Sequence, residues 1–370
     1  MRVVLLPGST PSPWDGIEVY SYELGKSLAR LGHEVIGLKI GERTGERRIM
    51  DNYYVRYVAV PRVRSALGYH LGFMLAALKE AKGLKTADVV HAVGGYYASI
   101  EFLPIRKIVT IIGASTLRES SSLRRRLRAT YGRLLYKRAL AYIVPNGIIA
   151  EEVKVRFGIK NVHVIPMGVD VDDLRPVNEK GQVREKYGFR GDDIIILYVG
   201  QLVRGKRLPE LLTAFKKFSA THNRAKLLLL SWGYLKEELL KLTTTLGLEG
   251  KVIFMSPVPY QQRKDIYHLS DAFVMIGDSF GDGGISTALM DALAAGLPSV
   301  VAKNTANSIV VRDGINGFTV TPTAPEDVSK ALESCLDEKE RLSRNALEIA
   351  RQYSWGNVAQ KINEVYKTIL

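Results

Sequence analysis

The 370-residue chain has one cysteine, Cys335, so it cannot form an internal disulfide bond. Its longest uncharged runs, such as VVHAVGGYYASI and ALAAGLPSVVA, are shorter than the roughly 18 residues of a membrane-spanning helix and contain Gly or Pro. The first residues, MRVVLLPGST, have too short an apolar core for a signal peptide. We therefore expect neither a disulfide-rich secreted protein nor a membrane-spanning one, and predict a cytoplasmic location.

Acidic residues are scarce in the N-terminal part of the chain. Residues 1–170 contain 26 Lys and Arg but 14 Asp and Glu, whereas the rest is nearly balanced, and the formal charge of the whole chain is +14. Such a field attracts anionic partners such as phosphorylated substrates or acidic lipid surfaces. Nucleic-acid binding is not predicted, because no recognition motif accompanies the charge.

Short apolar runs rich in β-branched residues alternate with longer amphipathic segments, which predicts parallel sheets covered by helices. The rhythm restarts after GVDVDDLRPVNEKG, and residues 168–180 are the expected hinge because no apolar period runs through them. We expect two doubly wound α/β domains, with an active cleft between them and ligands beyond the carboxyl ends of the strands. The predicted strands are 2–6, 34–40, 53–60, 88–93, 107–112, 141–145 and 162–166, then 193–200, 226–232, 251–255, 272–276, 298–302 and 317–320.

The stretch AFVMIGDSFGDGGISTALMDALAAGLP combines a predicted strand, a glycine-rich loop and a helix. Ser286 or Thr287 is the expected N-cap of the helix, and Gly296 its C-terminal stop. Glycines allow close approach of a ligand, and the unpaired N–H groups of a helix start favour a phosphate. We therefore predict a diphosphate here, with Asp291 one turn further on accepting hydrogen bonds from sugar hydroxyls. The alternative is a tight strand-to-helix turn in which Asp291 is simply solvated.

Several motifs occur in a recognisable order: VHVIPMGVDVDDLRP, ILYVGQLVRGKRLPELLTAF, VIFMSPVPYQQRKDIYHLSDAFV, MDALAAGLPSVVA and DGINGF. Together they resemble the GT-B glycosyltransferases of family 4 (glycosyl transferases group 1). DGIEVYSYELGKSLARLGHEV is similar to the family's opening glycine loop and first helix, and SWGNVAQKINEVYKTIL to its terminal helix, which crosses back to the first domain. The resemblance implies two Rossmann-like domains facing across a cleft: an acceptor-side domain of residues 1–170 plus 355–370, and a nucleotide-sugar-binding domain of residues 171–354.

Members of this family transfer a sugar from a nucleotide diphosphate sugar with retention of anomeric configuration, generally without an essential metal. For this chain the resemblance implies a UDP- or GDP-linked donor, no cofactor, no metal site, and a glycan or lipid-linked acceptor. A diphosphate that departs without a divalent ion needs fixed cations and hydrogen-bond donors. Lys206 matches the lysine of the family's phosphate clamp and follows the strand DIIILYVG.

Two carboxylates of the family, separated by seven residues, are matched only in part. Asp291 stands at the second, which holds the ribose hydroxyls; it is one methylene shorter but still accepts two hydrogen bonds. Gly283 occupies the register of the first, with Asp282 one position early. Either a one-residue shift in the loop brings Asp282 to the donor sugar as a catalytic group, or that contact is missing.

Two further positions depart from the family pattern. Gln201 replaces the arginine of the phosphate clamp, and Ile112 replaces the histidine that usually follows the strand KIVTI. Arg204 or Arg207 is expected to substitute for the missing arginine, because a guanidinium can reach a phosphate from a neighbouring backbone position. No obvious residue replaces the histidine.

Near the N-terminus, Gly16 and Ile17 match the family's glycine loop beside the donor phosphates. Asp15 either orients an acceptor hydroxyl or caps the helix that begins at Ile17. The family's base contacts are made largely by backbone near Pro257 and Val258, so they do not distinguish uracil from guanine. The implied donor-binding residues are Gly16, Ile17, Gln201, Arg204, Lys206, Val258, Gly283, Gly284, Ile285, Ser286, Thr287 and Asp291.

Residues 121–140, SSLRRRLRATYGRLLYKRAL, predict a basic amphipathic helix with seven cations around a leucine and tyrosine stripe. One interpretation is a scaffold helix with solvated arginines. The other is docking on an anionic membrane, to which each nearby Lys or Arg contributes roughly 1 kcal/mol. In the second case the protein is peripheral at the inner membrane face.

Two other classes of function compete with the enzyme. A non-catalytic GT-B relative that binds a nucleotide, a glycan or a protein is consistent with the altered residues Gln201, Ile112 and Gly283, whereas the presence of Lys206, the glycine loop and Asp291 favours the enzyme. A dinucleotide-dependent oxidoreductase is disfavoured, because the turn after RVVLLPG lacks the glycine fingerprint and EVIGLK ends in Lys39 rather than an acid.

Overall fold

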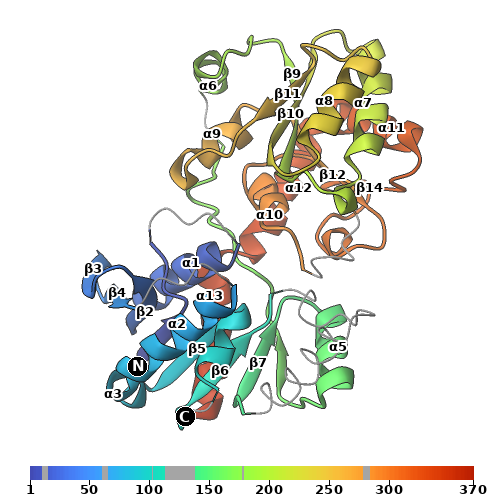
Figure 1. Cartoon of the computed structure of the whole chain (residues 1–370). Coiled ribbons are helices and arrows are strands. Elements are labelled where there is room, and N and C mark those ends of the chain that lie inside the picture. Colours follow the sequence, from blue (N-terminus) through green and yellow to red (C-terminus); the bar gives the residue numbers. More distant parts are fainter. Residues whose placement is uncertain (11–15, 61–65, 102, 113–137, 177–178, 278–283) are drawn as a thin grey trace. The chain divides into compact units, whose positions relative to one another are not determined.

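The structure is a computed structural model that describes residues 1–10, 16–60, 66–101, 103–112, 138–176, 179–277 and 284–370. It divides into two compact units: unit 1 comprises Met1–Gly168, Asp282–Gly284 and Trp355–Leu370, and unit 2 comprises Val169–Gly281 and Ile285–Ser354. Each unit is built on one sheet with helices on both faces (Figure 1). The predicted fold class, two doubly wound α/β units, is therefore confirmed.

The sheet of unit 1 has the strand order β3-β4-β2-β1-β5-β6-β7-β8. Seven of these strands coincide with predicted ones and pair in parallel. The expectation of purely parallel strands is wrong for β3, which pairs antiparallel with β4. The strands are β1 Arg2–Leu6, β2 Glu34–Gly41, β3 Gly45–Met50, β4 Tyr53–Ala59, β5 Val89–Val93, β6 Lys107–Thr110, β7 Ala141–Val144 and β8 Val162–Val164.

Helices cover both faces of this sheet because their apolar residues recur at helical spacing. On one face, Tyr20, Leu24 and Leu28 of α1 pack with Trp355 and Ile362 of the C-terminal helix α13. On the other face, Phe73 of α2 and Ile149 and Val153 of α5 are buried in one core. The helices among the described residues of unit 1 are α1 Gly16–Arg30, α2 Ala66–Lys79, α3 Ala81–Lys85, α5 Gly147–Phe157 and α13 Trp355–Ile369, with the 3-10 turn η1 Gly94–Ser99.

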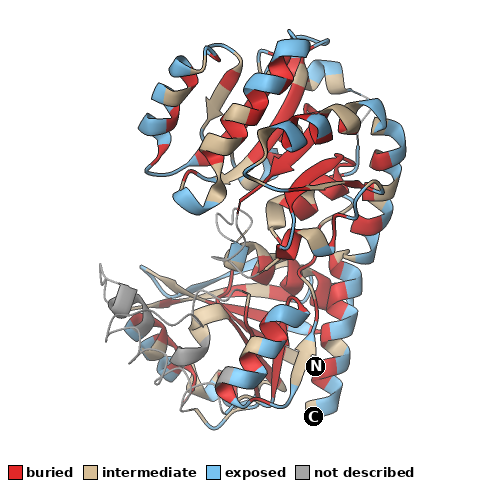
Figure 2. Cartoon of the chain, turned by 90° about the vertical axis from the view of Figure 1, so that its right-hand side faces the viewer, coloured by how far each residue is buried: buried red, intermediate tan, exposed pale blue. Residues whose placement is uncertain are grey.

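The sheet of unit 2 has the order β11-β10-β9-β12-β13-β14, and its pairings are all parallel among the described residues. Every strand predicted for the second half of the chain is present. Their interiors are buried on both faces (Figure 2), as expected for a parallel sheet between helices. The strands are β9 Ile194–Gln201, β10 Ala225–Trp232, β11 Val252–Met255, β12 Ala272–Met275, β13 Ser299–Ala302 and β14 Gly317–Val320.

Two sets of helices cover the sheet of unit 2. One face packs against α9, α10 and α12, and the other against α7, α8 and α11. We call these the α10 face and the α7 face. The helices are α6 Lys180–Lys186, α7 Leu208–Thr221, α8 Lys236–Thr245, α9 Arg263–His268, α10 Thr287–Ala294, α11 Pro325–Asp337 and α12 Lys339–Gln352, with the 3-10 turns η3 Arg204–Lys206, η4 Tyr260–Gln262 and η5 Ala306–Ile309.

Both strand orders contain a point at which consecutive connections run in opposite directions. In unit 2 this point lies between β9 and β12, and in unit 1 between β1 and β5. Ligands of open parallel sheets bind at the carboxyl ends of the strands at such a switch point. The loops that follow β9 and β12 in unit 2 are therefore the first place to look for a site.

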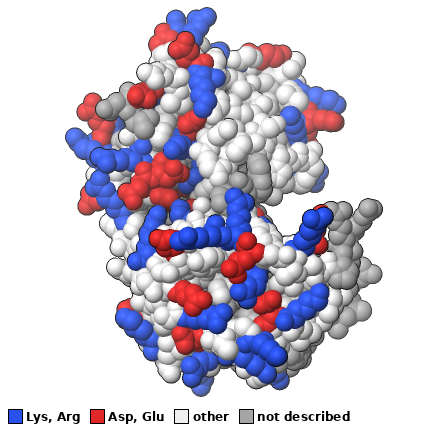
Figure 3. Space-filling model, turned by 90° about the vertical axis from the view of Figure 1, so that its left-hand side faces the viewer, with Lys and Arg blue, Asp and Glu red and all other residues white. Residues whose placement is uncertain are grey.

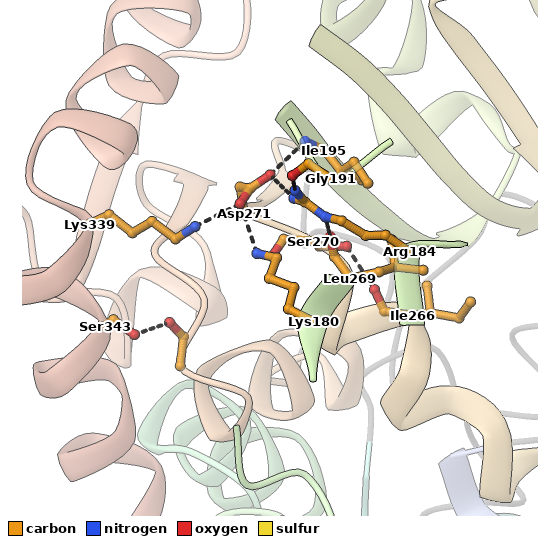
Figure 4. A network of polar contacts seen from close by, with 11 residues as sticks. Lys180, Arg184, Gly191, Ile195, Ile266, Leu269, Ser270, Asp271, Lys339 and Ser343 are labelled. Atoms are coloured by element: carbon orange, nitrogen blue, oxygen red, sulfur yellow. Dashed lines mark hydrogen bonds and ion pairs between the residues drawn. The ribbon is translucent and has the colours of Figure 1, made fainter. Parts of the chain in front are cut away.

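The amino ends of the unit 2 strands hold a buried polar network around Asp271 (Figure 4). Its carboxylate accepts hydrogen bonds from Lys180 at 2.8 Å, Arg184 at 2.6 Å and Lys339 at 2.6 Å. It also accepts one from the backbone N–H of Ile195 at 2.8 Å. The network joins α6, α12 and two strands at the edge opposite the carboxyl ends, so its role is structural.

A second buried polar chain ties α13 to the sheet of unit 1. His91 on β5 contacts the hydroxyl of Tyr366 through Nδ1 at 2.7 Å and that of Thr110 through Nε2 at 2.6 Å. The Tyr20 and Thr110 hydroxyls lie 3.2 Å apart. Burial lowers the pKa of His91 to about 3, so the imidazole is neutral at physiological pH.

Among the described helices, none is both long enough and apolar enough to cross a bilayer. Charged side chains instead cover much of the surface. Figure 3 shows Lys and Arg interspersed with Asp and Glu over one face of the chain. Ion pairs among the described residues include those of Arg56 with Glu46 and Glu80.

Candidate functional site

The loop after β9 lies directly against the end of β12. A Cβ atom on Gly277 would stand 2.8 Å from the Cα of Lys206 and 3.0 Å from the carbonyl oxygen of Gly205. Real Cβ atoms do not approach backbone this closely, so only glycine permits the contact. Lys206 is therefore held at the switch point of unit 2, beside the start of the glycine loop, and its side chain is partly exposed.

The start of α10 is the second part of the site. Ser286 is the N-cap residue, as predicted, but its side chain makes no capping hydrogen bond. Its backbone N–H donates to Oδ1 of the buried Asn307 at 2.9 Å, which fixes the entry of the chain into the helix. The amides of the first turn retain their attraction for an anion. The helix stops before Gly296, which has a φ of 73°.

Asp291 does not lie on a simply solvated face of α10. Its Oδ2 accepts a hydrogen bond from Nε of Arg263 at 3.2 Å, and its side chain is 19% exposed. Arg263 also donates through Nη1 to Asp173 at 3.0 Å and to the carbonyl of Tyr260 at 3.1 Å. The guanidinium lies over the ring of Tyr260, 3.7 Å from its centroid. Arg263 thus links the segment before α6, the turn η4 and helix α10 of unit 2.

The electrostatics of this cluster favour its charged form. Burial by itself disfavours the cation of Arg263, but the carboxylates of Asp291 and Asp173 outweigh it and raise the pKa of Arg263 above its usual value. Burial, followed by the charge of Asp291, raises the pKa of Tyr267 well above its ordinary range, so the phenol stays neutral. Asp291 is therefore a carboxylate held by a permanent cation.

Arg263 is a residue of this site that the sequence interpretation missed. It occurs in the polar run YQQRKDIYHLSD, in which an arginine is expected to be exposed to solvent. The available signal was its position three and four residues before Ile266 and Tyr267, which places it on the apolar side of α9. Its residue exposure is only 8%.

The cations proposed to replace the missing clamp arginine differ in their surroundings. Arg207 donates to Glu210 at 2.9 Å and is partly engaged in that ion pair. Arg204 is exposed, and its backbone N–H donates to the Tyr234 hydroxyl at 3.4 Å. Gln201 is also exposed and ends β9. Of the two arginines, Arg204 has the more open position.

Of the other predicted donor-binding residues, Val258, Ile285 and Thr287 belong to unit 2. Val258 packs in part against the core of the α10 face, and Ile285 is buried in that core. Thr287 begins α10, and Gly284 precedes Ile285 as a partly buried bend. Asp282 and Gly283, which include the uncertain catalytic carboxylate, lie outside the described residues.

The predicted site residues Gly16 and Ile17 also belong to unit 1. Gly16 begins α1, and the side chain of Ile17 lies against Gly94, where a Cβ would stand 3.1 Å from Ile17 Cδ1. Gly94 has a φ of 62° and follows β5, so these residues lie at the switch point of unit 1. Ile112 packs in part against the core and carries no polar group. Asp15 falls outside the described residues, and so does Arg124 of the basic segment 121–140.

In the described part of the chain, no group of three or more His, Cys, Asp or Glu side chains is arranged to hold a metal ion. The single thiol, Cys335, is buried in the core of the α7 face, which raises its pKa. The polar groups described at the switch point of unit 2 are thus a lysine, helix-start amides and a carboxylate paired with arginine. Such a set suits an anion next to a hydroxyl-bearing group.

Two family descriptions match the chain. Glycosyltransferase Family 4 matches residues 14–173, and Glycosyl transferases group 1 matches residues 179–353. An uncharacterised glycosyltransferase of Methanocaldococcus jannaschii is 31% identical over 193 residues, which are 51% of this chain and 48% of that protein. A D-inositol 3-phosphate glycosyltransferase of Catenulispora acidiphila is 31% identical over 219 residues, 55% of this chain and 50% of that protein. The chain thus spans about half the length of the curated relatives it matches.

Solved structures share the fold at low sequence identity. Sucrose-phosphate synthase of Thermosynechococcus elongatus has a TM-score of 0.78 at 16% identity, covering 100% of this chain and 98% of that one. HepE of Anabaena in complex with UDP-glucose has a TM-score of 0.75 at 16% identity and full coverage of both chains. These similarities establish the two-domain GT-B fold.

Proposed function

The chain belongs to the family 4 glycosyltransferases with the GT-B fold, and we propose that it transfers a sugar from a nucleotide diphosphate sugar to an acceptor hydroxyl with retention of anomeric configuration. The bond between the anomeric carbon and the diphosphate oxygen breaks, and its electron pair stays on the diphosphate. The acceptor oxygen takes its place at the anomeric carbon, and the proton of the acceptor hydroxyl passes to the departing diphosphate. The proposed reaction uses no metal ion.

The placement of Lys206 supports this proposal most directly. Its Cα is packed on Gly277 at the switch point, and the glycine loop that follows leads into α10, whose Ser286 side chain does not cap the first turn. A cation and helix-start amides at one edge can hold a diphosphate and stabilise the charge it gains as it departs. We assign this role to Lys206 and the amides of α10, with Arg204 as the additional cation.

Asp291 is the proposed ligand of the ribose hydroxyls. A carboxylate held on one oxygen by Arg263 has a fixed orientation, which favours geometric recognition of a diol. Because HepE is described in complex with UDP-glucose, UDP is the first nucleotide to test, with GDP as the alternative. Asp282 remains the proposed contact to the donor sugar.

The proposed acceptor is a glycan or a lipid-linked acceptor, and the cationic excess of residues 1–170 favours an anionic one. We propose that the basic segment 121–140 adds peripheral binding at the cytoplasmic face of an anionic membrane. Most of this segment lies outside the described residues. Replacing Arg124, Arg125, Arg126 and Arg128 by Glu should abolish co-sedimentation with anionic vesicles; unchanged co-sedimentation would remove this part of the proposal.

Calorimetric titration with UDP and with GDP in EDTA tests the donor site. The parent protein should bind one of them without metal, and Lys206→Ala and Asp291→Ala should each weaken binding by about 10- to 100-fold, as expected for charged hydrogen bonds. Lys216→Ala, at an exposed position on α7, is the matched control and should bind normally. Failure of the parent to bind either nucleotide would favour a non-catalytic GT-B relative. Retention is tested separately, by the anomeric configuration of the product in NMR.

A further inference from the structure

Trp232 ends β10 at the carboxyl edge of the unit 2 sheet, and it is 48% exposed. Of the aromatic side chains whose surroundings the structure describes, only Trp232 and Tyr234, at 70%, are exposed to this degree. Tryptophan usually buries most of its surface, because the indole ring is large and apolar. An open indole at the edge where ligands of such sheets bind is not explained by core packing.

The alternation of side chains places Trp232 on the α10 face. Along β10, Leu227 and Leu229 join the core of the α7 face, whereas Leu228 and Leu230 join that of the α10 face. Since successive side chains of a strand point to opposite faces, position 232 falls on the same side as Leu230.

The neighbouring strand gives the same result. On β9, Leu197 and Val199 pack on the α10 face, so Gln201 falls on that side as well. Trp232 is the register partner of Gln201. The indole therefore stands next to the end of β9, on the side of the sheet that carries α10 and Asp291.

The backbone of Trp232 is fixed to the loop that carries Lys206. The N–H of Leu202 donates to the carbonyl of Trp232 at 2.7 Å, and the N–H of Leu235 donates to the carbonyl of Leu202 at 3.1 Å. Between them, Gly233 has a φ of 149°, and a Cβ there would stand 2.5 Å from the carbonyl oxygen of Leu202. These contacts pack the loop after β10 against the loop after β9, so they fix the backbone that carries the indole.

We propose that Trp232 is a stacking surface for the nucleobase of the donor. This inference rests on the proposed function: a diphosphate held by Lys206 and the start of α10, with a ribose at Asp291, leaves the base on the α10 face at the carboxyl edge. An indole face binds a base through apolar contact and π-stacking and tolerates any base, since every base has a π-face. The chain would thus gain nucleotide affinity from a ring that does not select between uracil and guanine.

The test compares Trp232→Leu with Trp232→Phe, using calorimetry with UDP, GDP and inorganic pyrophosphate. Trp232→Leu should lower the affinity for the nucleotide that the parent binds by about tenfold, which is the scale of one stacking contact. It should leave the affinity for pyrophosphate unchanged. Trp232→Phe should keep most of the nucleotide affinity. Leu240→Ala on α8, which removes another exposed apolar side chain, is the control and should change neither ligand.

Other outcomes would overturn the inference. If Trp232→Leu binds nucleotides as the parent does while Lys206→Ala does not, the donor site stands and the stacking surface is refuted. Equal losses of nucleotide and pyrophosphate affinity would show that the substitution disturbs the Lys206 loop rather than removing a base contact. A parent protein that binds none of the three probes would refute both the stacking surface and the proposed function. Circular dichroism melting checks that each variant is folded.

Discussion

Nε of Arg263 lies 3.2 Å from Oδ2 of Asp291, and the same guanidinium donates to Asp173 through Nη1. Residue 263 begins α9, residue 291 is in α10, and residue 173 precedes α6. Arg263 therefore sets the orientation of Asp291, the proposed partner of the ribose hydroxyls, without itself contacting the ribose. It is a positioning residue, and its effects should differ from those of Asp291.

Replacing Arg263 by Gln should weaken nucleotide binding only where Asp291 is present. In the parent protein we expect a loss of about tenfold, because a partly buried carboxylate without its cation no longer presents a fixed acceptor. In an Asp291→Ala background the same change should add little, and the double-mutant cycle measures this coupling. Calorimetry with UDP or GDP gives all four affinities. Additive losses would show that Arg263 acts independently of Asp291.

Gly277→Ala should displace the loop of Lys206, because the new methyl group would stand 2.8 Å from the Cα of that residue. We expect a loss of unfolding free energy of roughly 1–3 kcal/mol, typical of overpacking, together with weaker nucleotide binding. Gly205→Ala is the matched control in the contacting loop, since a Cβ there meets no atom within 4 Å. Urea denaturation and calorimetry report the two effects, and equal behaviour of the two variants would contradict the steric explanation.

His91 should make stability fall with acidification. Burial lowers its folded pKa to about 3, against about 6.5 in the unfolded chain. As the pH falls from about 6.5 towards 3, the unfolded state binds a proton that the folded state does not, which lowers the free energy of unfolding by about 1.4 kcal/mol per pH unit. His91→Gln cannot take up this proton. Urea denaturation between pH 7 and 4 should show a shallower dependence for the variant, and parallel curves would refute the assignment.

Asp271→Ala should be strongly destabilising while leaving nucleotide recognition by the folded protein unchanged. Removing the carboxylate leaves Arg184, whose side chain is 6% exposed, without its anion, and breaking such a buried pair costs about 3–5 kcal/mol. Although burial opposes ionisation, Lys180 and Lys339 lower the pKa of Asp271 to about 2. This contribution is fully present above about pH 4 and is lost as the pH falls towards 2. Urea denaturation at several pH values measures it; a loss of nucleotide affinity at temperatures where the variant is folded would show that the network supports the site as well.

The strands and the glycine loop could be predicted from sequence because their signals are local. Runs such as DIIILYVG are buried on both faces, so continuous apolar residues identify them. The strand GERRIM was not predicted, because it pairs with β4 alone and its first four residues are exposed. Its sequence therefore has no apolar pattern. A strand stabilised mainly by one neighbour's backbone has no sequence signature of its own.

The candidate site divides in the same way. Lys206 and Asp291 were identified because they follow strands and match motifs. Arg263 and Trp232 were not, because their importance depends on contacts with residues distant in sequence: Arg263 on Asp173 and Asp291, and Trp232 on its register with Gln201. Long-range pairing of this kind emerges only when the elements pack, since neither residue breaks its local pattern. The departures at Gln201 and Ile112 are visible in the sequence, but their consequences for activity are not.

The C-terminal helix α13 belongs to unit 1, although every element of unit 2 precedes it in the chain. During synthesis from the N-terminus, the strands of unit 1 emerge first but lack Trp355, Ile362 and Tyr366 in their core, and His91 lacks its tyrosine partner. Unit 2 is complete as soon as Ser354 has left the ribosome. Unit 2 can therefore complete its native core before unit 1, although unit 1 is synthesised first. Until α13 is synthesised, the nascent unit 1 exposes the apolar face that this helix covers.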